Sequence, residues 1–275
     1  MNQLAVVDQA EVNSLIAQLN GSQEQEQIRV PFLKIQYEPE DKRERAVPRG
    51  SFLMSEQDEP VYAKKVKIRV LAQHFQYRQT DPDTYKIVNK SILMNDMRRG
   101  EPRDMKGGLR CGKPTGKALA QMSDDEKKRF DGIKAFRILR GIVSYTGETA
   151  DGEQVTVENA PFQMFLKGLN FMPFEKASGT LPRGKRIQDV WFDLSTHKDG
   201  KAFIVDFSVD YDTPAPLDMD TVETLKVFAA MYDQENSTIE RRYREALQGS
   251  RSDAAYDEAT EYLRDGMDDL EADFD

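Results

Sequence analysis

Cysteine, histidine and tryptophan are scarce in this chain. Its 275 residues include one cysteine, two histidines and one tryptophan. Cys111 has no partner for a disulfide within the chain, and a zinc site built from several cysteines is excluded. With only His74 and His197 to add, a bound metal would have to rest on carboxylate oxygens. We therefore expect no cofactor.

Long apolar runs are missing as well. No stretch of about 18 apolar residues exists, so we expect no membrane-spanning segment. The first residues, MNQLAVVDQAEVNSL, lack the basic region and the apolar stretch of a secretory signal. Together with the single cysteine, these absences predict a reduced, cytoplasmic protein.

Charge is plentiful but segregated. Charged residues make up 32% of the chain, and the formal net charge is −9. Residues 252–275 hold ten acids and one base, so this short segment carries the whole net charge. Residues 61–143 hold 20 bases against nine acids, a net charge of +11. A basic middle of this kind favours a polyanionic partner such as nucleic acid.

The order of the predicted elements indicates an α+β protein with a β-rich centre. Alternating apolar residues predict strands over 62–77 and 135–145, and a shorter run predicts another over 154–158. The best hairpin joins 187–194 to 202–211 through a turn over 197–200, in which Gly200 can take a positive φ. Helical spacing of apolar residues predicts helices over 161–171, 221–232 and 237–247. The expected parts are a helix and linker over 1–27, a core over 28–212, a helical segment over 213–251 and a disordered tail over 252–275.

The strand over 62–77 is the main candidate for binding. Lys65, Lys67 and Arg69 alternate with apolar residues, so they share one face. If the alternation continues, Phe75 and Tyr77 lie on that basic face. Single-stranded nucleic acid is held by a positive groove and by aromatic rings on which bases stack. The strand therefore predicts a nucleic-acid contact. The alternative is a solvated lysine-rich face with the rings turned into the core.

A further strand is predicted over 85–94, and a glycine- and base-rich segment of about twenty residues follows it. It supplies Arg98, Arg99 and Arg110, which extend the basic patch. Gly107, Gly112 and Lys113 fit the spacing of a phosphate-binding loop, but proline follows the lysine and no apolar strand precedes the loop. Nucleotide hydrolysis is therefore disfavoured. We interpret the segment as a loop that contacts phosphates without reading bases.

Two other functions remain open at this point. Asp189, Asp193, Asp206 and Asp210 recur on the strands of the predicted hairpin and could hold a divalent cation, which would suit a metal-dependent nuclease. A solvated acidic face is the ordinary alternative. The second function is that of a structural or assembly protein whose tail only solvates it. No serine or cysteine nucleophile can be paired with a histidine by sequence context.

The acidic tail ends in DDLEADFD, which mixes acids with Leu270 and Phe274. Such a peptide can occupy the basic groove of its own protein or dock on a partner. With its basic centre and this tail, the chain resembles the phage-type single-stranded DNA-binding proteins. The resemblance implies an OB-fold core, roles in replication, recombination or repair, and contacts with a polymerase, helicase or recombinase. It also implies a host-cytoplasmic location and partner docking through the tail residues Asp268, Asp269, Leu270, Asp273 and Phe274.

The sequence therefore predicts an α+β fold with an OB-like barrel, long basic loops, C-terminal helices and a disordered acidic tail. The expected function is non-catalytic binding of single-stranded DNA with little base preference. The predicted contact residues are Lys65, Lys67, Arg69, Phe75, Tyr77, Arg98, Arg99 and Arg110.

Overall fold

A computed structural model describes residues 29–37, 49–55, 59–97, 99–108, 116–128, 130 and 132–249. The predicted helix and linker over 1–27 and the tail over 252–275 lie outside these residues. The strands and helices, in chain order, are β1 (Leu33–Ile35), β2 (Phe52–Met54), β3 (Val66–Thr80), β4 (Ile87–Lys90), α2 (Gly116–Gln121), α3 (Asp124–Lys128), β5 (Ile133–Glu148), β6 (Gln154–Leu166), α4 (Met172–Ser178), β7 (Trp191–Asp199), β8 (Ala202–Asp210) and α5 (Met219–Gly249).

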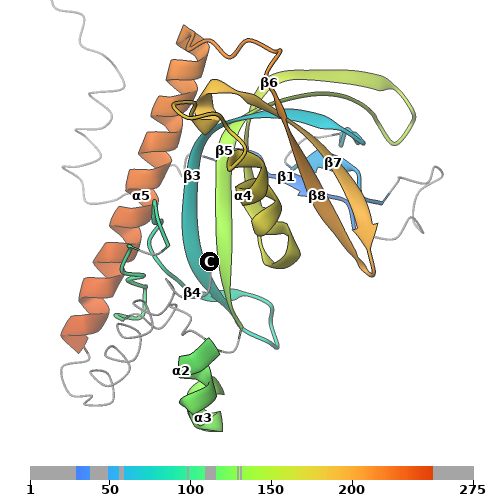
Figure 1. The fold of residues 1–275 in the computed structure, drawn as a ribbon. Helices are drawn as coiled ribbons and strands as arrows, with labels where there is room; N and C mark the ends of the chain where they lie inside the picture. The colour runs from blue at the N-terminus through green and yellow to red at the C-terminus, as the bar shows by residue number, and fades with distance from the viewer. Residues whose placement is uncertain are drawn as a thin grey trace, which may run out of the picture.

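An antiparallel sheet organises the fold. Its strands follow the order β6-β5-β3-β7-β8, and β4 pairs with the end of β3. β1 and β2 form a separate pair, which an isolated bridge between Phe32 and Gln163 joins to β6. The sheet curves strongly, so that α4 lies on its concave side and α5 runs along its convex side (Figure 1). The α+β class with a mostly antiparallel sheet is confirmed.

A bulge in β3 changes the face to which its side chains point. The register with β5 skips Leu71. Before this residue, Val66 and Ile68 face the concave core, and after it Phe75 and Tyr77 do so. Because strand side chains alternate with a period of two, one extra residue reverses the pattern.

Gly141 on β5 allows the close approach of the two strands at this bulge. It lies opposite Val70, and a Cβ on it would be 1.9 Å from the carbonyl oxygen of Arg69. Any larger residue would force β3 and β5 apart. The glycine in the middle of an otherwise apolar strand therefore marks the bulge.

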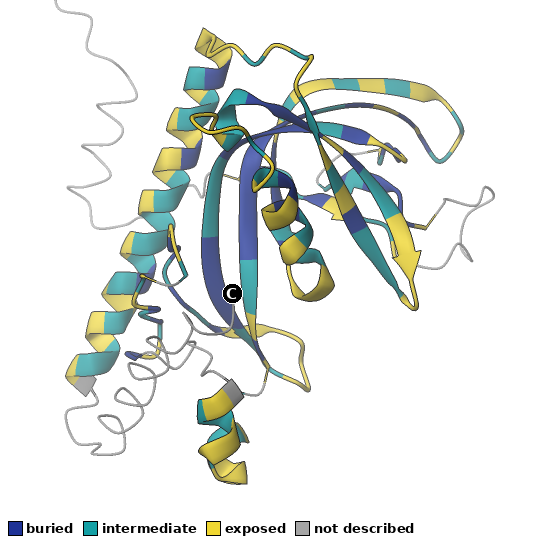
Figure 2. Ribbon diagram, in the orientation of Figure 1, coloured by how far each residue is buried: buried dark blue, intermediate teal, exposed yellow. Residues whose placement is uncertain are grey.

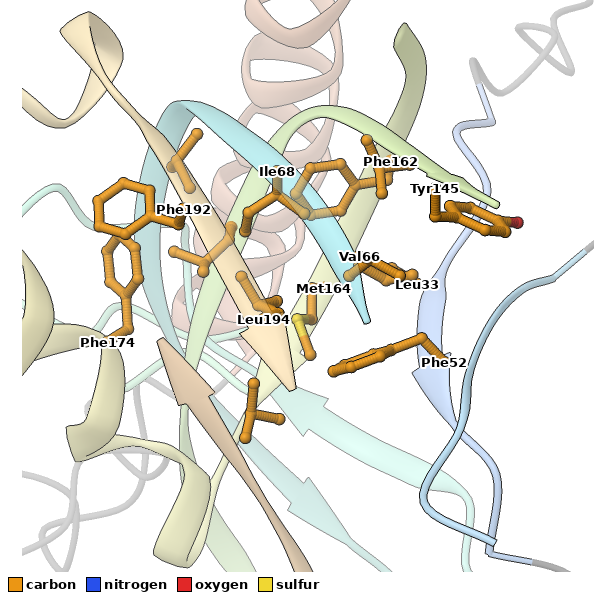
Figure 3. Packing of buried hydrophobic residues seen from close by; sticks show 14 of the residues in the cluster. Leu33, Phe52, Val66, Ile68, Tyr145, Phe162, Met164, Phe174, Phe192 and Leu194 are labelled. Atoms are coloured by element: carbon orange, nitrogen blue, oxygen red, sulfur yellow. The ribbon is translucent and has the colours of Figure 1, made fainter. Parts of the chain in front are cut away.

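The main hydrophobic core fills the concave side. Phe174 of α4 is fully buried, and its ring centroid lies 5.2 Å from that of Phe192 and 5.3 Å from that of Phe207. Figure 3 shows Phe52 beside Met164, so that β2 and β6 contribute to the same core. The predicted hairpin is confirmed over 191–210, where β7 and β8 pair from Trp191↔Asp210 to Asp199↔Ala202. Its predicted start is wrong, because Ile187–Asp189 is a short 3-10 helix, and the turn is tighter than predicted, because residues 197–199 pair within β7.

A second, smaller core lies between the convex side and α5. Phe228 of α5 is 2% exposed and packs with Leu71, Ile142 and Trp191. The outer side of α5 is exposed along most of its length (Figure 2). The Asn236 side chain binds the backbone of Leu93, accepting its N–H at 2.7 Å and donating to its carbonyl oxygen at 3.1 Å. These contacts fix the helix on the sheet.

The helix predicted over 161–171 is wrong. Its first six residues belong to β6, which pairs with β5 from Ile142↔Pro161 to Arg137↔Leu166. β6 is an edge strand of the six-stranded sheet. Proline lacks a backbone N–H, and an edge strand tolerates it because the N–H groups on its outer side need no partner strand. The following turn, Gly168–Asn170, is a short 3-10 helix that leads into α4.

The two helices predicted over 221–232 and 237–247 form one continuous helix of 31 residues. Ser237 and Glu240 have the spacing of a capping box, but they lie inside α5. Tertiary contacts made by Glu235 and Asn236 to the sheet hold this stretch helical. Local capping signals were therefore overridden by packing.

Candidate nucleic-acid interface

The predicted basic face of β3 is only partly available to a ligand. Lys65 is exposed just before the strand. The Lys67 ammonium lies 2.6 Å from a carboxylate oxygen of Asp210 and donates to the Thr213 hydroxyl at 2.9 Å. The hydrogen bond from Lys67, with a second from Thr213, holds the pKa of Asp210 well below its usual range. The positive charge of Lys67 is therefore largely compensated within the protein.

Arg69 is a structural residue, which corrects its place among the predicted contacts. It is 2% exposed, and its guanidinium donates to the carbonyl oxygens of Gln188, Ala215 and Pro216 at 2.6–2.9 Å. Burial lowers the pKa of this guanidinium. Arg69 thus ties β3 to the segment that leads into α5, and its donors are not free to bind a phosphate.

Phe75 and Tyr77 lie on the opposite face from Lys67, so the predicted continuation of the alternation is wrong. The bulge at Leu71 turns both rings to the concave side, where they are 9% and 8% exposed. They pack with Met94 and Ile133. Burial raises the pKa of Tyr77 to about 12. Both residues belong to the hydrophobic core and offer no open ring face.

The remaining predicted contacts divide into one exposed residue and several outside the described part of the chain. The Arg99 side chain is 89% exposed and lies 3.7 Å from the Asp96 carboxylate. Arg98 and Arg110 lie outside the described residues, as do Asp268, Asp269, Leu270, Asp273 and Phe274 of the tail. Of the expected groove, Arg99 and Lys65 are the described residues that the structure leaves exposed.

The four carboxylates proposed as metal ligands are each paired with a basic side chain of the protein, and Asp193 and Asp210 share Lys67. Arg186 donates to Asp189 at 3.0 Å, His197 pairs with Asp206 at 2.7 Å, and Lys67 lies 3.9 Å from Asp193 besides holding Asp210. In the part of the chain that the structure describes, no three histidine, cysteine or acidic side chains are placed to share a metal ion. The geometry therefore gives no support to the nuclease alternative.

A different surface combines aromatic rings with cations. Three segments each carry a phenylalanine and a lysine two residues apart: Phe32 and Lys34 at β1, Lys134 and Phe136 on β5, and Phe165 and Lys167 at the end of β6. Residues two apart on a strand share a face. We call these six residues the Phe–Lys patch.

The three rings of the Phe–Lys patch lie against one another on the convex side of the sheet. The Phe165 centroid is 5.1 Å from that of Phe32 and 6.3 Å from that of Phe136, both edge to face. Each ring is half-buried. Phe136 lies opposite Gln76, whose side chain donates to Glu235 of α5, so the patch is on the face that α5 covers in part.

Cations surround these rings. The Lys34 ammonium is 5.6 Å from the Phe32 centroid, and the Lys167 ammonium is 5.6 Å from that of Phe136. The Arg78 guanidinium lies 4.2 Å from the Phe165 centroid. All three lysines are exposed, and among the described residues no carboxylate is within 4.0 Å of their ammonium groups. Within the described residues, the patch therefore offers unpaired lysine charge beside aromatic surface.

Sequence reasoning missed the Phe–Lys patch because it looked for one strand with many bases. The available signal was the triplet FLK, which occurs at 32–34 and again at 165–167, together with the reversed pattern KAF at 134–136. Each triplet is too short to stand out alone. Only the register, which places β1 beside β6 and β6 beside β5, brings the three together.

The fold and this surface define an α+β protein with a curved antiparallel sheet and an exposed basic and aromatic patch. No protein-family model, curated protein or solved structure matches the chain. Within the described residues, none of the helices combines the length and the apolar character needed to cross a membrane.

Proposed function

We propose that the protein binds single-stranded DNA without catalysis and with little base preference, through the Phe–Lys patch. The observation that carries the proposal is the meeting of three phenylalanine rings and three exposed lysines on one face of the sheet. Aromatic rings accept any base because every base has a π-face, and lysines neutralise phosphates. The side chains that meet here, rings and cations, suit binding rather than bond cleavage.

The curved sheet supports a finer proposal about the fold. OB-folds are partly open barrels of five antiparallel strands, and they bind oligonucleotides on a strand face. The β1–β2 pair lies beside β6 and the β7–β8 hairpin, with the Thr196 hydroxyl donating to the Gly50 carbonyl oxygen at 2.6 Å. We infer an OB-like barrel from this partial closure.

The acidic tail and the basic surface suggest how such binding is regulated. We propose that residues 252–275 compete with DNA for the basic surface and dock a polymerase, helicase or recombinase when DNA displaces them. The support is the opposite charge of the two regions, +11 over 61–143 and −9 over 252–275, together with the resemblance described above. Replication, recombination and repair are the processes in which such binding is used.

The proposal is tested by removing charge from the Phe–Lys patch. Lys134→Ala with Lys167→Ala should weaken binding to a labelled oligo(dT) and lower the slope of log K against log salt by about 0.7 per lysine that contacts a phosphate. The matched control is Lys198→Ala with Lys201→Ala, two exposed lysines at the β7–β8 turn. Both double variants lose the same formal charge, so a general field effect would move them equally.

Three results would contradict the proposal. The wild-type protein could fail to bind at low salt, the two double variants could bind alike, or the oligonucleotide could be cleaved on incubation with magnesium. The third result would restore the nuclease alternative. A parallel titration with oligo(rU) separates DNA from RNA, because only RNA offers the 2′-hydroxyl.

A further inference from the structure

The turn between β3 and β4 is built by hydrogen bonds around one aspartate. The Asp81 carboxylate accepts the backbone N–H groups of Asp83 and Thr84 at 3.0 and 2.8 Å and the Thr84 hydroxyl at 3.0 Å. The Tyr85 N–H donates to the Asp81 carbonyl oxygen at 2.9 Å, and the Asp81 N–H donates to that of Lys86 at 2.9 Å. The turn is therefore fixed from within.

Tyr85 occupies the one position in this turn that a large side chain should avoid. Its φ is +56°, in the left-handed region where glycine or asparagine is favoured and a bulky residue is unusual. Its side chain is not held by packing, because the residue is 83% exposed. A strained conformation of an exposed aromatic residue indicates a function for the ring rather than a need of the fold.

The turn adjoins one end of the Phe–Lys patch. Arg78 on β3 pairs with Lys134 on β5, and the Thr80 N–H donates to the Gly132 carbonyl oxygen at 3.1 Å. Thr80 immediately precedes the turn. A nucleic-acid strand that runs over Phe136 and Lys134 toward this end of the sheet therefore meets the turn next.

We propose that Tyr85 is a base-stacking contact that extends the Phe–Lys patch beyond the end of the sheet. This inference rests on the proposed function and names one further residue of the same site. The turn carries no net positive charge. Its one base, Lys86, is offset by Asp83, which is exposed like Lys86, and the Asp81 carboxylate accepts hydrogen bonds within the turn. Its contribution to binding must therefore come from the ring, and it should depend little on salt.

Three variants separate the ring from the backbone. Tyr85→Phe keeps the ring and should bind oligo(dT) like the wild type. Tyr85→Asn removes the ring and relieves the left-handed strain, so affinity should fall by about 5- to 150-fold while the melting temperature stays equal or rises. Tyr211→Ala is the control, since Tyr211 is an exposed tyrosine (55%) just after β8.

The salt slope and a comparison of variants decide the outcome. Tyr85→Asn should leave the slope of log K against log salt unchanged, whereas Lys134→Ala with Lys167→Ala lowers it. If Tyr85→Asn binds like the wild type while the lysine variant is weakened, this inference is wrong and the proposed function stands. If the melting temperature falls together with affinity, the ring has a structural role and the inference is also wrong. If the wild type does not bind, the proposed function itself fails.

Discussion

Burial decides what each arginine of the basic centre can do. Arg69, Arg78, Arg137 and Arg140 are all at most 9% exposed. Arg137 shows the pattern most fully: it lies 4.9 to 5.6 Å from the centroids of three phenylalanine rings and donates to Glu175 at 2.6 Å. Such residues hold the sheet and its two helices together. The charge of +11 over 61–143 therefore overstates the charge that a ligand meets.

His74 gives a prediction for the pH dependence of stability. Its ring stacks on Tyr232 at 4.7 Å between centroids. Burial lowers the pKa of His74 to about 4, helped by Arg140 and opposed by Glu235. The unfolded chain therefore takes up this proton first as the pH falls, near 6.5. The contribution of neutral His74 is present above about pH 6.5 and is lost between there and pH 4, on the order of 3 kcal/mol in all.

The measurement is the free energy of unfolding by denaturant at several pH values between 7 and 4. His74→Phe keeps an aromatic ring against Tyr232 and should flatten the curve in this window. An equal slope in wild type and His74→Phe would show that other groups carry the pH dependence.

Part of the candidate site could be predicted from the sequence, and the rest depends on contacts that only the fold creates. Composition located a basic region and correctly placed Lys65 and Arg99 at the surface. It could not show that Arg69 is bound to carbonyl oxygens contributed by residues more than a hundred positions away, or that Asp210 compensates Lys67. Phe75 and Tyr77 were misplaced because a bulge of one residue has no clear mark in the sequence of β3 itself.

The Glu235 carboxylate holds α5 on the sheet through contacts with several side chains of the strands. The Glu235 carboxylate accepts from Lys90 at 2.8 Å and from Gln76 at 3.0 Å, and it lies 3.5 Å from the Arg140 guanidinium. Burial alone would raise the pKa of Glu235, but Lys90 and the neighbouring donors outweigh it and lower the pKa. The acid is therefore ionised at neutral pH and balances the positive charge under the helix.

Glu235→Gln should destabilise the protein by about 3 kcal/mol or more, because removing one partner of a buried ion pair leaves the other uncompensated. Glu223→Gln is the matched control on the same helix. Glu223 pairs with Lys226 at 2.7 Å, but both side chains are at least 60% exposed, so its loss should cost less than about 1 kcal/mol. Denaturant unfolding measures both variants. Equal effects would mean that Glu235 does not anchor α5.

Elements with strong local signals were the predictable ones. The β7–β8 hairpin has regular alternation and Gly200 at φ +57°. Ser123 and Glu126 have the sequence spacing of a capping box, and they form one at the start of α3. The sequence predicts a helix at the end of β6 because the apolar residues there also fit a helical spacing. The union of two predicted helices into α5 depends on contacts with the sheet, which local spacing does not reveal.

At the scale of the whole molecule, the sheet separates two kinds of surface. The concave side is closed by α4 and the main core, while the convex side is shared between α5 and the Phe–Lys patch. A ligand on the patch would touch strands β1, β5 and β6, which the sheet holds in fixed register. A rigid platform of this kind loses little conformational entropy on binding. The acidic segment over 252–275 follows α5 in the chain and is tethered to the same body.

Deleting residues 252–275 should tighten binding to single-stranded DNA at low salt. The deletion removes a net charge of −9 and leaves a chain with equal numbers of bases and acids. A tethered peptide acts at an effective concentration near millimolar, so even a weak contact with the Phe–Lys patch competes with DNA. Because salt screens the attraction of the tail, the difference between full-length and truncated protein should shrink as salt rises.

Two salt titrations, with full-length and truncated protein, measure this effect, and two further variants locate it. Phe274→Ala should leave DNA affinity nearly unchanged, because the ring adds apolar contact rather than charge, while weakening the docking of a partner protein. In the Lys134→Ala, Lys167→Ala background, truncation should improve affinity less than in the wild type, since tail and DNA then share a weaker surface. If full-length and truncated protein have the same DNA affinity at every salt concentration, the tail does not bind the patch. A truncation effect of undiminished size in the lysine variant would place the tail on another basic surface.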